Sequence, residues 1–100
     1  MKRTKQDLVD TVITACEGGV NYWARVLDYD PDKGTATLID FESEEHKRYQ
    51  INTSIVRKGL KAMLESDNEY WRKVSVSDIL DAEGADIAIQ FGLFGDLVYA

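Results

Sequence analysis

EGGVNYWARV, residues 17–26, marks the point where the residue pattern of the chain changes from helical to extended. Apolar residues before this stretch recur at helical spacing. They are Leu8, Val9, Val12, Ile13 and Cys16. Thr4 and Asp7 form a capping-box pattern ahead of them. Gly18 and Gly19 end the predicted helix at residues 5–17, because glycine accepts the left-handed conformation that closes many helices.

From Val20 onward the period becomes two, which predicts a strand. Alternation places Asn21, Trp23 and Arg25 on one face of that strand, with Tyr22 on the opposite face. DPDKG, residues 30–34, is a strong turn signal, because proline presets its own φ and glycine supplies a positive φ. β-branched residues after the turn predict a second strand over residues 35–41 and therefore an antiparallel hairpin.

The remainder of the chain predicts a third short strand, two more helices and a packed tail. The second helix begins at Thr53 or Ser54 and carries a regular apolar stripe as far as Leu64. The third helix is capped by Ser77, starts near Asp78 and is apolar nearly all round past Ala85, which predicts a central or interface helix. The other expected segments are a charged loop at 42–48, a strand at 49–51, an acidic loop at 65–69 and a packed tail at 97–99.

These elements predict an α+β fold in the order α-β-β-(β)-α-α, with a small antiparallel sheet packed with three helices. The 100 residues are expected to form a single domain, residues 1–100. Two strands alone make a poor sheet, so either the helices cover it or two chains join their sheets. A homo-oligomer is accordingly expected.

The composition restricts the partners. The formal net charge of −6, from 18 acidic and 12 basic residues, argues against direct nucleic-acid binding, which depends on Lys and Arg neutralising phosphates. No apolar run approaches the length of a membrane span, and the basic start of the chain is not followed by the apolar core of a signal peptide. A single cysteine fits a reducing compartment, so the cytoplasm is expected.

The strand face after the glycines is a candidate ligand platform. Trp23 or Tyr22 can stack on a flat group, Arg25 can grip a phosphate, and Asn21 can read a polar edge. The alternative is purely structural, since two glycines end a helix and aromatic residues favour strands. Both interpretations stay open at the level of sequence.

A basic triplet in this acidic chain is a second candidate site. His46, Lys47 and Arg48 follow one another in the charged loop, and the predicted second helix adds further cations. The helix residues are Arg57, Lys58 and Lys61. This pattern is compatible with a local positive pocket for an anion, and equally with a solvated loop and a solvated helix face. His46 and Arg48 are taken as candidate ligand-binding residues.

No catalytic or cofactor-binding pattern is present. The only histidine lies in a charged loop, away from the apolar helix face that holds Cys16, so a catalytic thiol is not expected. The carboxylates of the third helix lack the His or Cys partners of a zinc site, and no metal or cofactor is predicted. The chain is therefore predicted not to be an enzyme.

Several strings resemble a family of small proteins of bacteriophages, mostly from actinobacterial hosts. They are EGG with NYW at 17–23, KGL at 58–60, DAEGAD at 81–86 and QFGLFGDLVY at 90–99. The resemblance covers nearly the whole chain and implies an accessory protein made in the cytoplasm of an infected bacterium. It carries no functional residues over to this sequence.

Three functions are compatible with these observations. The first is a homo-oligomeric, non-enzymatic protein that sequesters a nucleotide-like small molecule, as a counter-defence protein would. The second is an acidic inhibitor or nucleic-acid mimic that binds a host protein through residues 65–69 and the carboxylates of the third helix. The third is a carboxylate- and metal-dependent nucleotide hydrolase.

Overall fold

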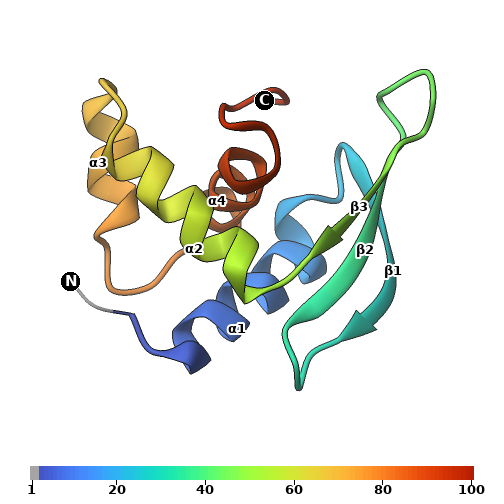
Figure 1. The fold of residues 1–100 in the computed structure, drawn as a ribbon, viewed down its shortest axis with the longest axis horizontal. Helices are drawn as coiled ribbons and strands as arrows, with labels where there is room; N and C mark the ends of the chain where they lie inside the picture. Colours follow the sequence, from blue (N-terminus) through green and yellow to red (C-terminus); the bar gives the residue numbers. More distant parts are fainter. Residues whose placement is uncertain (1–2) are drawn as a thin grey trace.

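The structure is a computed structural model that describes residues 3–100, and within that range the chain forms four α-helices, a π-helical turn and three strands. In chain order they are α1 (Lys5–Thr14), η1 (Ala15–Gly19), β1 (Ala24–Asp30), β2 (Thr35–Asp40), β3 (Arg48–Ile51), α2 (Thr53–Leu64), α3 (Glu69–Ser75) and α4 (Ala82–Phe94). The predicted α+β class with one antiparallel sheet is confirmed (Figure 1).

The three strands follow one another across the sheet in the order β1-β2-β3, and both neighbouring pairs are antiparallel. Val26, Leu38 and Tyr49 lie in one cross-strand row on the face that packs against the helices. Arg25, Ile39 and Arg48 form the next row, which alternation places on the outer face. The helices lie on one side of the sheet (Figure 1).

The predicted hairpin turn is confirmed at residues 30–34. Asp30 closes it twice, because its carbonyl accepts from the Gly34 N–H at 2.9 Å and its carboxylate accepts from the Asp32 and Lys33 N–H groups. Gly34 has a φ of +69° and lies against Val9 of α1, so the turn anchors the far end of the sheet to the first helix.

The predicted start of the first strand at Val20 is wrong, because β1 begins at Ala24. The chain leaves α1 through η1, and residues 21–23 form a turn in which the Trp23 and Ala24 N–H groups both donate to the Val20 carbonyl. Val20 and Trp23 are both fully buried. A regular strand would send these two side chains to opposite faces, whereas a tight turn allows both to enter the core.

Helix α4 is the centre of the fold, and every residue from 84 to 92 is buried. It begins at Ala82 with Asp81 as its N-cap, whose carboxylate accepts from the Gly84 N–H at 2.8 Å. The predicted start near Asp78 with a Ser77 cap is therefore wrong. Asp81 is the N-cap because it directly precedes the first residue of α4. The Ser77 hydroxyl instead donates to the Val74 carbonyl.

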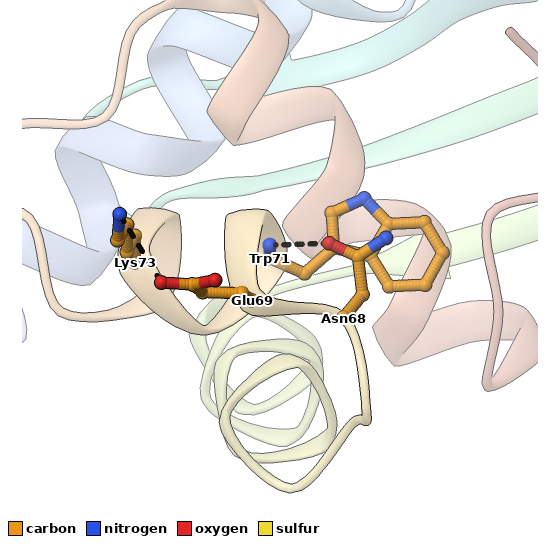
Figure 2. Close-up of polar contacts among 4 residues, drawn as sticks. All are labelled: Asn68, Glu69, Trp71 and Lys73. Atoms are coloured by element: carbon orange, nitrogen blue, oxygen red, sulfur yellow. Dashed lines mark hydrogen bonds and ion pairs between the residues drawn. The ribbon is translucent and has the colours of Figure 1, made fainter.

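Helix α3 is an additional element that the apolar pattern did not predict. Asn68 caps it by accepting from the Trp71 N–H at 3.0 Å, and Glu69 forms an ion pair with Lys73 at 3.4 Å (Figure 2). The rings of Trp71 and Phe91 on α4 pack in a T-shaped arrangement at a centroid distance of 4.8 Å. Only seven residues long, the helix depends on this contact and its cap rather than on a long apolar stripe.

Candidate functional site

The six residues predicted to bind a ligand lie in separate surroundings. Trp23 is in the core, Tyr22 lies on a surface hollow, and Arg25 and Arg48 lie on the outer face of the sheet. Asn21 and His46 are exposed in the two loops. The continuous platform of Asn21, Trp23 and Arg25 required a strand at positions 21–23, and the turn found there does not build it.

Trp23 is held by Asp86, a carboxylate buried on α4. The indole Nε1 of Trp23 donates to Asp86 Oδ1 at 2.8 Å, and the Tyr22 hydroxyl donates to Asp86 Oδ2 at 2.5 Å. The amide of Gln90, one helical turn farther along, donates to Asp86 Oδ1 at 3.0 Å. Asp86 therefore fixes the NYW turn to the central helix, and Trp23 has no exposed surface on which a ligand can stack.

The chain after α4 is attached to the same polar cluster. Gln90 Oε1 accepts from the Val98 and Tyr99 N–H groups at 2.9 and 2.8 Å, and Gln90 Nε2 donates to the Tyr99 carbonyl at 3.0 Å. The Tyr99 ring stacks on Trp23 at a centroid distance of 5.1 Å. The prediction that the 97–99 tail packs against the fold is thus confirmed for Leu97 and Tyr99, while Val98 is exposed.

The Tyr99 hydroxyl connects this tail to the sheet by donating to Asp40 Oδ2 at 2.5 Å. Asp40 is buried at the end of β2, and its other oxygen accepts from the Glu42 and Ser43 N–H groups. The hydrogen bond to the Asp40 carboxylate, together with burial, raises the pKa of Tyr99 to about 12. Burial and the bond to Asp86 raise the pKa of Tyr22 to about 12 as well.

A hollow of about 450 Å³ lies between η1, the start of α4 and this tail, and we call it the tail hollow. It is lined by Gly18, Gly19, Tyr22, Ala82, Glu83, Asp86, Ile87, Leu97, Tyr99 and Ala100. Its charged side chains are carboxylates, and no Lys, Arg or His is among the lining residues. The glycines and Tyr22 of the opening motif thus border a hollow, but one of acidic character.

Arg25 and Arg48 lie on either side of Ile39 in the same cross-strand row of the outer face. Because neighbouring strands are about 4.8 Å apart, the two backbones are separated by roughly 10 Å. Both side chains are exposed. Arg25 and Arg48, both predicted to bind a ligand, therefore share one face of the sheet. Neither residue lines the tail hollow or the larger hollow beside α2, so this face lacks the concave shape of a small-molecule site.

A second hollow, of about 500 Å³, lies between α1, α2 and the segment after α3, and we call it the basic hollow. It is lined by Arg3, Leu8, Arg57, Leu60, Lys61, Leu64, Ser75 and Val76. Arg57 and Lys61 are one turn apart on α2, so they border the hollow together. Leucine and valine side chains form its apolar lining, and all three of its charged residues are basic.

Arg3 joins α1 to the end of α3 at this hollow. Its Nη2 atom donates to the carbonyls of Ser75 and Ser77, at 2.9 and 2.6 Å. The sequence places Arg57 and Lys61 in one basic group but gives no sign of Arg3, because the contact of Arg3 with Ser75 spans 72 positions. Only the packing of α1 against α2 brings the three cations together.

Other chemistry is limited in residues 3–100. That part of the chain contains no group of three or more His, Cys, Asp or Glu residues placed to hold a metal ion. Cys16 is buried, and loss of solvation raises the pKa of its thiol to about 11, which disfavours the nucleophilic thiolate. None of the helices in these residues combines the length and apolar character that crossing a membrane requires.

The chain shows no match to a known protein family, to a curated protein or to a solved structure. The choice among candidate functions therefore depends on the shape, charge and hydrogen bonding of the two hollows.

Proposed function

We propose that the protein is a non-enzymatic binding protein and that its ligand is a small anion with an apolar part, such as a nucleotide. The observation that carries this proposal is the basic hollow, in which Arg3, Arg57 and Lys61 border an apolar lining. The proposal keeps the nucleotide-like ligand predicted from the sequence and moves its site away from the Trp23 turn.

The size and lining of the basic hollow suit such a ligand. Small-molecule sites are concave, have volumes of roughly 300–1,000 Å³ and combine apolar walls with a few polar groups. Leu64 is 50% exposed and Val76 is 43% exposed, so a flat apolar ring lying on them would remove both from water. Burial of these two side chains would supply the apolar part of the binding free energy.

The cations would supply specificity for the anionic group. Arginine forms paired hydrogen bonds to phosphate, and lysine adds a mobile point charge. Within residues 3–100, the only ion pair joins Glu69 to Lys73, so neither Arg57 nor Lys61 has a carboxylate partner there. A phosphate would therefore meet basic side chains that no acidic neighbour already occupies.

The experiment is isothermal titration of the protein with a panel of cyclic nucleotides and ADP-ribose derivatives. We expect a member of the panel to bind, and we expect Arg57→Gln with Lys61→Gln to weaken its binding by about 100-fold or more, since each of the two lost charge-assisted bonds is worth about 1.5–3 kcal/mol. Raising the salt concentration should weaken binding in parallel.

A matched control is Arg25→Gln with Arg48→Gln, which removes the same net charge from the outer face of the sheet. This control variant should bind the ligand with an affinity within about twofold of the wild-type value. Equal losses in the two double variants would show that overall charge, and not the basic hollow, attracts the ligand. If no panel member produces heat and no small molecule co-purifies, the proposal fails.

The same proposal includes the biological setting implied by the phage resemblance. The protein would act in the cytoplasm of an infected bacterium, as a homo-oligomer, by removing a host signalling nucleotide. Native mass spectrometry of protein purified from that host reports subunit number and any retained ligand in one measurement. A monomer without retained ligand would argue against this setting.

A second candidate function is binding to a host protein, and exposed apolar side chains around α3 favour it. Ile79 is 86% exposed and Tyr70 is 52% exposed, and both border a hollow of about 360 Å³ between α3 and the start of α4. Acidic residues Asp67 and Glu69 lie close by in sequence. Pull-down from host lysate tests it, and Ile79→Ser or charge reversal at Asp67 and Glu69 should abolish capture.

A further inference from the structure

We infer that the tail hollow is a second binding site, which takes a small organic cation that combines an ammonium group with an apolar body. It has no residue in common with the basic hollow, so the inference is independent of the proposed function. Three properties of the lining lead to it: the sign of the charge, the supply of hydrogen-bond acceptors and the apolar walls.

The charge of the lining is negative. Glu83 is exposed at the rim, and Asp86 lies buried behind it on the same helix. One Glu83 oxygen accepts from the Tyr70 hydroxyl at 2.8 Å. The first turn of α4 also borders the hollow and would by itself favour an anion, but Asp81 caps it and Glu83 places a carboxylate there. The net preference is for a cation.

The side-chain hydrogen bonding of the lining points the same way. Two lining residues have a side-chain hydroxyl, and both donate inside the protein: Tyr22 to Asp86 and Tyr99 to Asp40. The side-chain group that remains for a ligand is an acceptor, the second Glu83 oxygen, since the Tyr99 carbonyl already accepts from Gln90 Nε2. An ammonium group offers three donors and no acceptor, so it fits this acceptor.

Apolar walls and an open mouth complete the site. Ala82, Ile87 and Leu97 supply carbon surface on the helix and tail sides. A Cβ atom added at Gly18 would meet nothing within 4 Å, so the mouth is open at that position. A Cβ at Gly19 would come within 2.6 Å of the Ala82 carbonyl oxygen, so glycine there lets η1 approach α4 and form the wall.

The test compares two probes with the same ring and opposite charge, tryptamine and indole-3-propionate, by NMR or calorimetric titration. We expect tryptamine to bind with a dissociation constant at or below about 1 mM, and indole-3-propionate to bind at least tenfold more weakly. Glu83→Gln should weaken tryptamine binding by about twofold to fivefold. Glu65→Gln, an exposed acid outside the hollow, should leave it unchanged.

Gly18→Leu is the decisive variant, because it adds a large side chain to a lining residue at a position where a Cβ atom meets nothing within 4 Å. Tryptamine binding should be lost while the melting temperature stays within a few degrees, and Gly18→Ala should retain binding. The inference is overturned if tryptamine does not bind the wild-type protein, or if Gly18→Leu or Glu83→Gln leaves its binding intact. Equal binding of the two probes would overturn it as well.

Discussion

Asp86 shows how much of this fold depends on a single side chain. Three donors meet its two oxygens: the Trp23 indole and the Tyr22 hydroxyl from the distant NYW turn, and the Gln90 amide one turn along the same helix. The sequence does contain a signal for this role, since Asp86 and Gln90, four positions apart, interrupt the apolar run of the helix past Ala85. Its partner Trp23 cannot be identified that way, because 63 positions separate the two residues.

Replacing Asp86 should therefore destabilise the protein strongly. Asp86→Ala leaves the buried indole N–H of Trp23 without an acceptor and removes one acceptor each from the Tyr22 hydroxyl and the Gln90 amide, and we expect a loss of about 3 kcal/mol in the free energy of unfolding. Asp86→Asn keeps one acceptor for Trp23 and should lose about 1 kcal/mol. Urea denaturation followed by Trp fluorescence measures both.

Glu83→Ala provides the control, because Glu83 lies on the same helix but is exposed. Its effect should stay within about 0.5 kcal/mol. If Asp86→Ala were as mild as Glu83→Ala, the NYW turn and the tail would have to be held by packing alone. The three hydrogen bonds at Asp86 would then contribute little.

At the scale of the elements, the contact between α2 and α4 depends on glycine. A Cβ atom added at Gly59 of α2 would overlap the carbonyl oxygen of Ala88, and one added at Gly92 of α4 would overlap the carbonyl oxygen of Ile55. The two glycines let the backbones approach each other directly. The helices consequently pack more closely than larger side chains at these positions would allow.

Gly59→Ala should separate these helices and destabilise the protein by roughly 3 kcal/mol, despite the better helix propensity of alanine. The new methyl group would overlap the backbone carbonyl of Ala88, and a backbone atom cannot move away by changing rotamer as a flexible side chain can. Gly18→Ala is the matched control, since its new methyl group meets open space and should change stability by less than about 1 kcal/mol. Thermal melts of both variants test this. Similar melting temperatures would contradict the close approach.

The elements with a local signal were predictable, and those that depend on distant contacts were not. The turn at residues 30–34 and the stripe of α2 follow from short-range rules, and the structure has both. α3 depends on the contact of Trp71 with Phe91, which no local pattern reveals. For the candidate site, Arg57 and Lys61 were found in sequence because they share one helix face, whereas Arg3 reaches them only through tertiary packing.

At the scale of the whole molecule, tyrosine hydroxyls join segments far apart in the chain. Tyr22 reaches α4, Tyr99 joins the tail to the end of β2, and Tyr29 of β1 donates to Glu17 of η1 at 2.9 Å. Each hydroxyl donates to a carboxylate, so each bond exists only while the phenol keeps its proton. The arrangement predicts that the fold as a whole is sensitive to alkali.

Stability should fall between about pH 10 and pH 12. Burial raises the pKa of Tyr22 and Tyr29 to about 12, and the bond to Asp40 raises that of Tyr99 to about 12, against an ordinary value of 10.0. Above pH 10 the unfolded chain has lost these protons while the folded protein still holds them. The free energy of unfolding therefore decreases as pH rises. The stabilisation that the raised pKa values contribute is fully present below pH 10 and is lost above about pH 12.

Absorbance at 295 nm follows tyrosine ionisation, and urea denaturation at each pH follows stability. Tyr99→Phe should be less stable at neutral pH because Asp40 loses a donor, but its stability should decline less steeply above pH 10, since one proton fewer is released on unfolding. All other ionisable groups are common to both proteins, so the difference in slope isolates Tyr99. Parallel slopes, or a native titration curve that matches the curve in urea, would show that these hydroxyls are not held by the carboxylates.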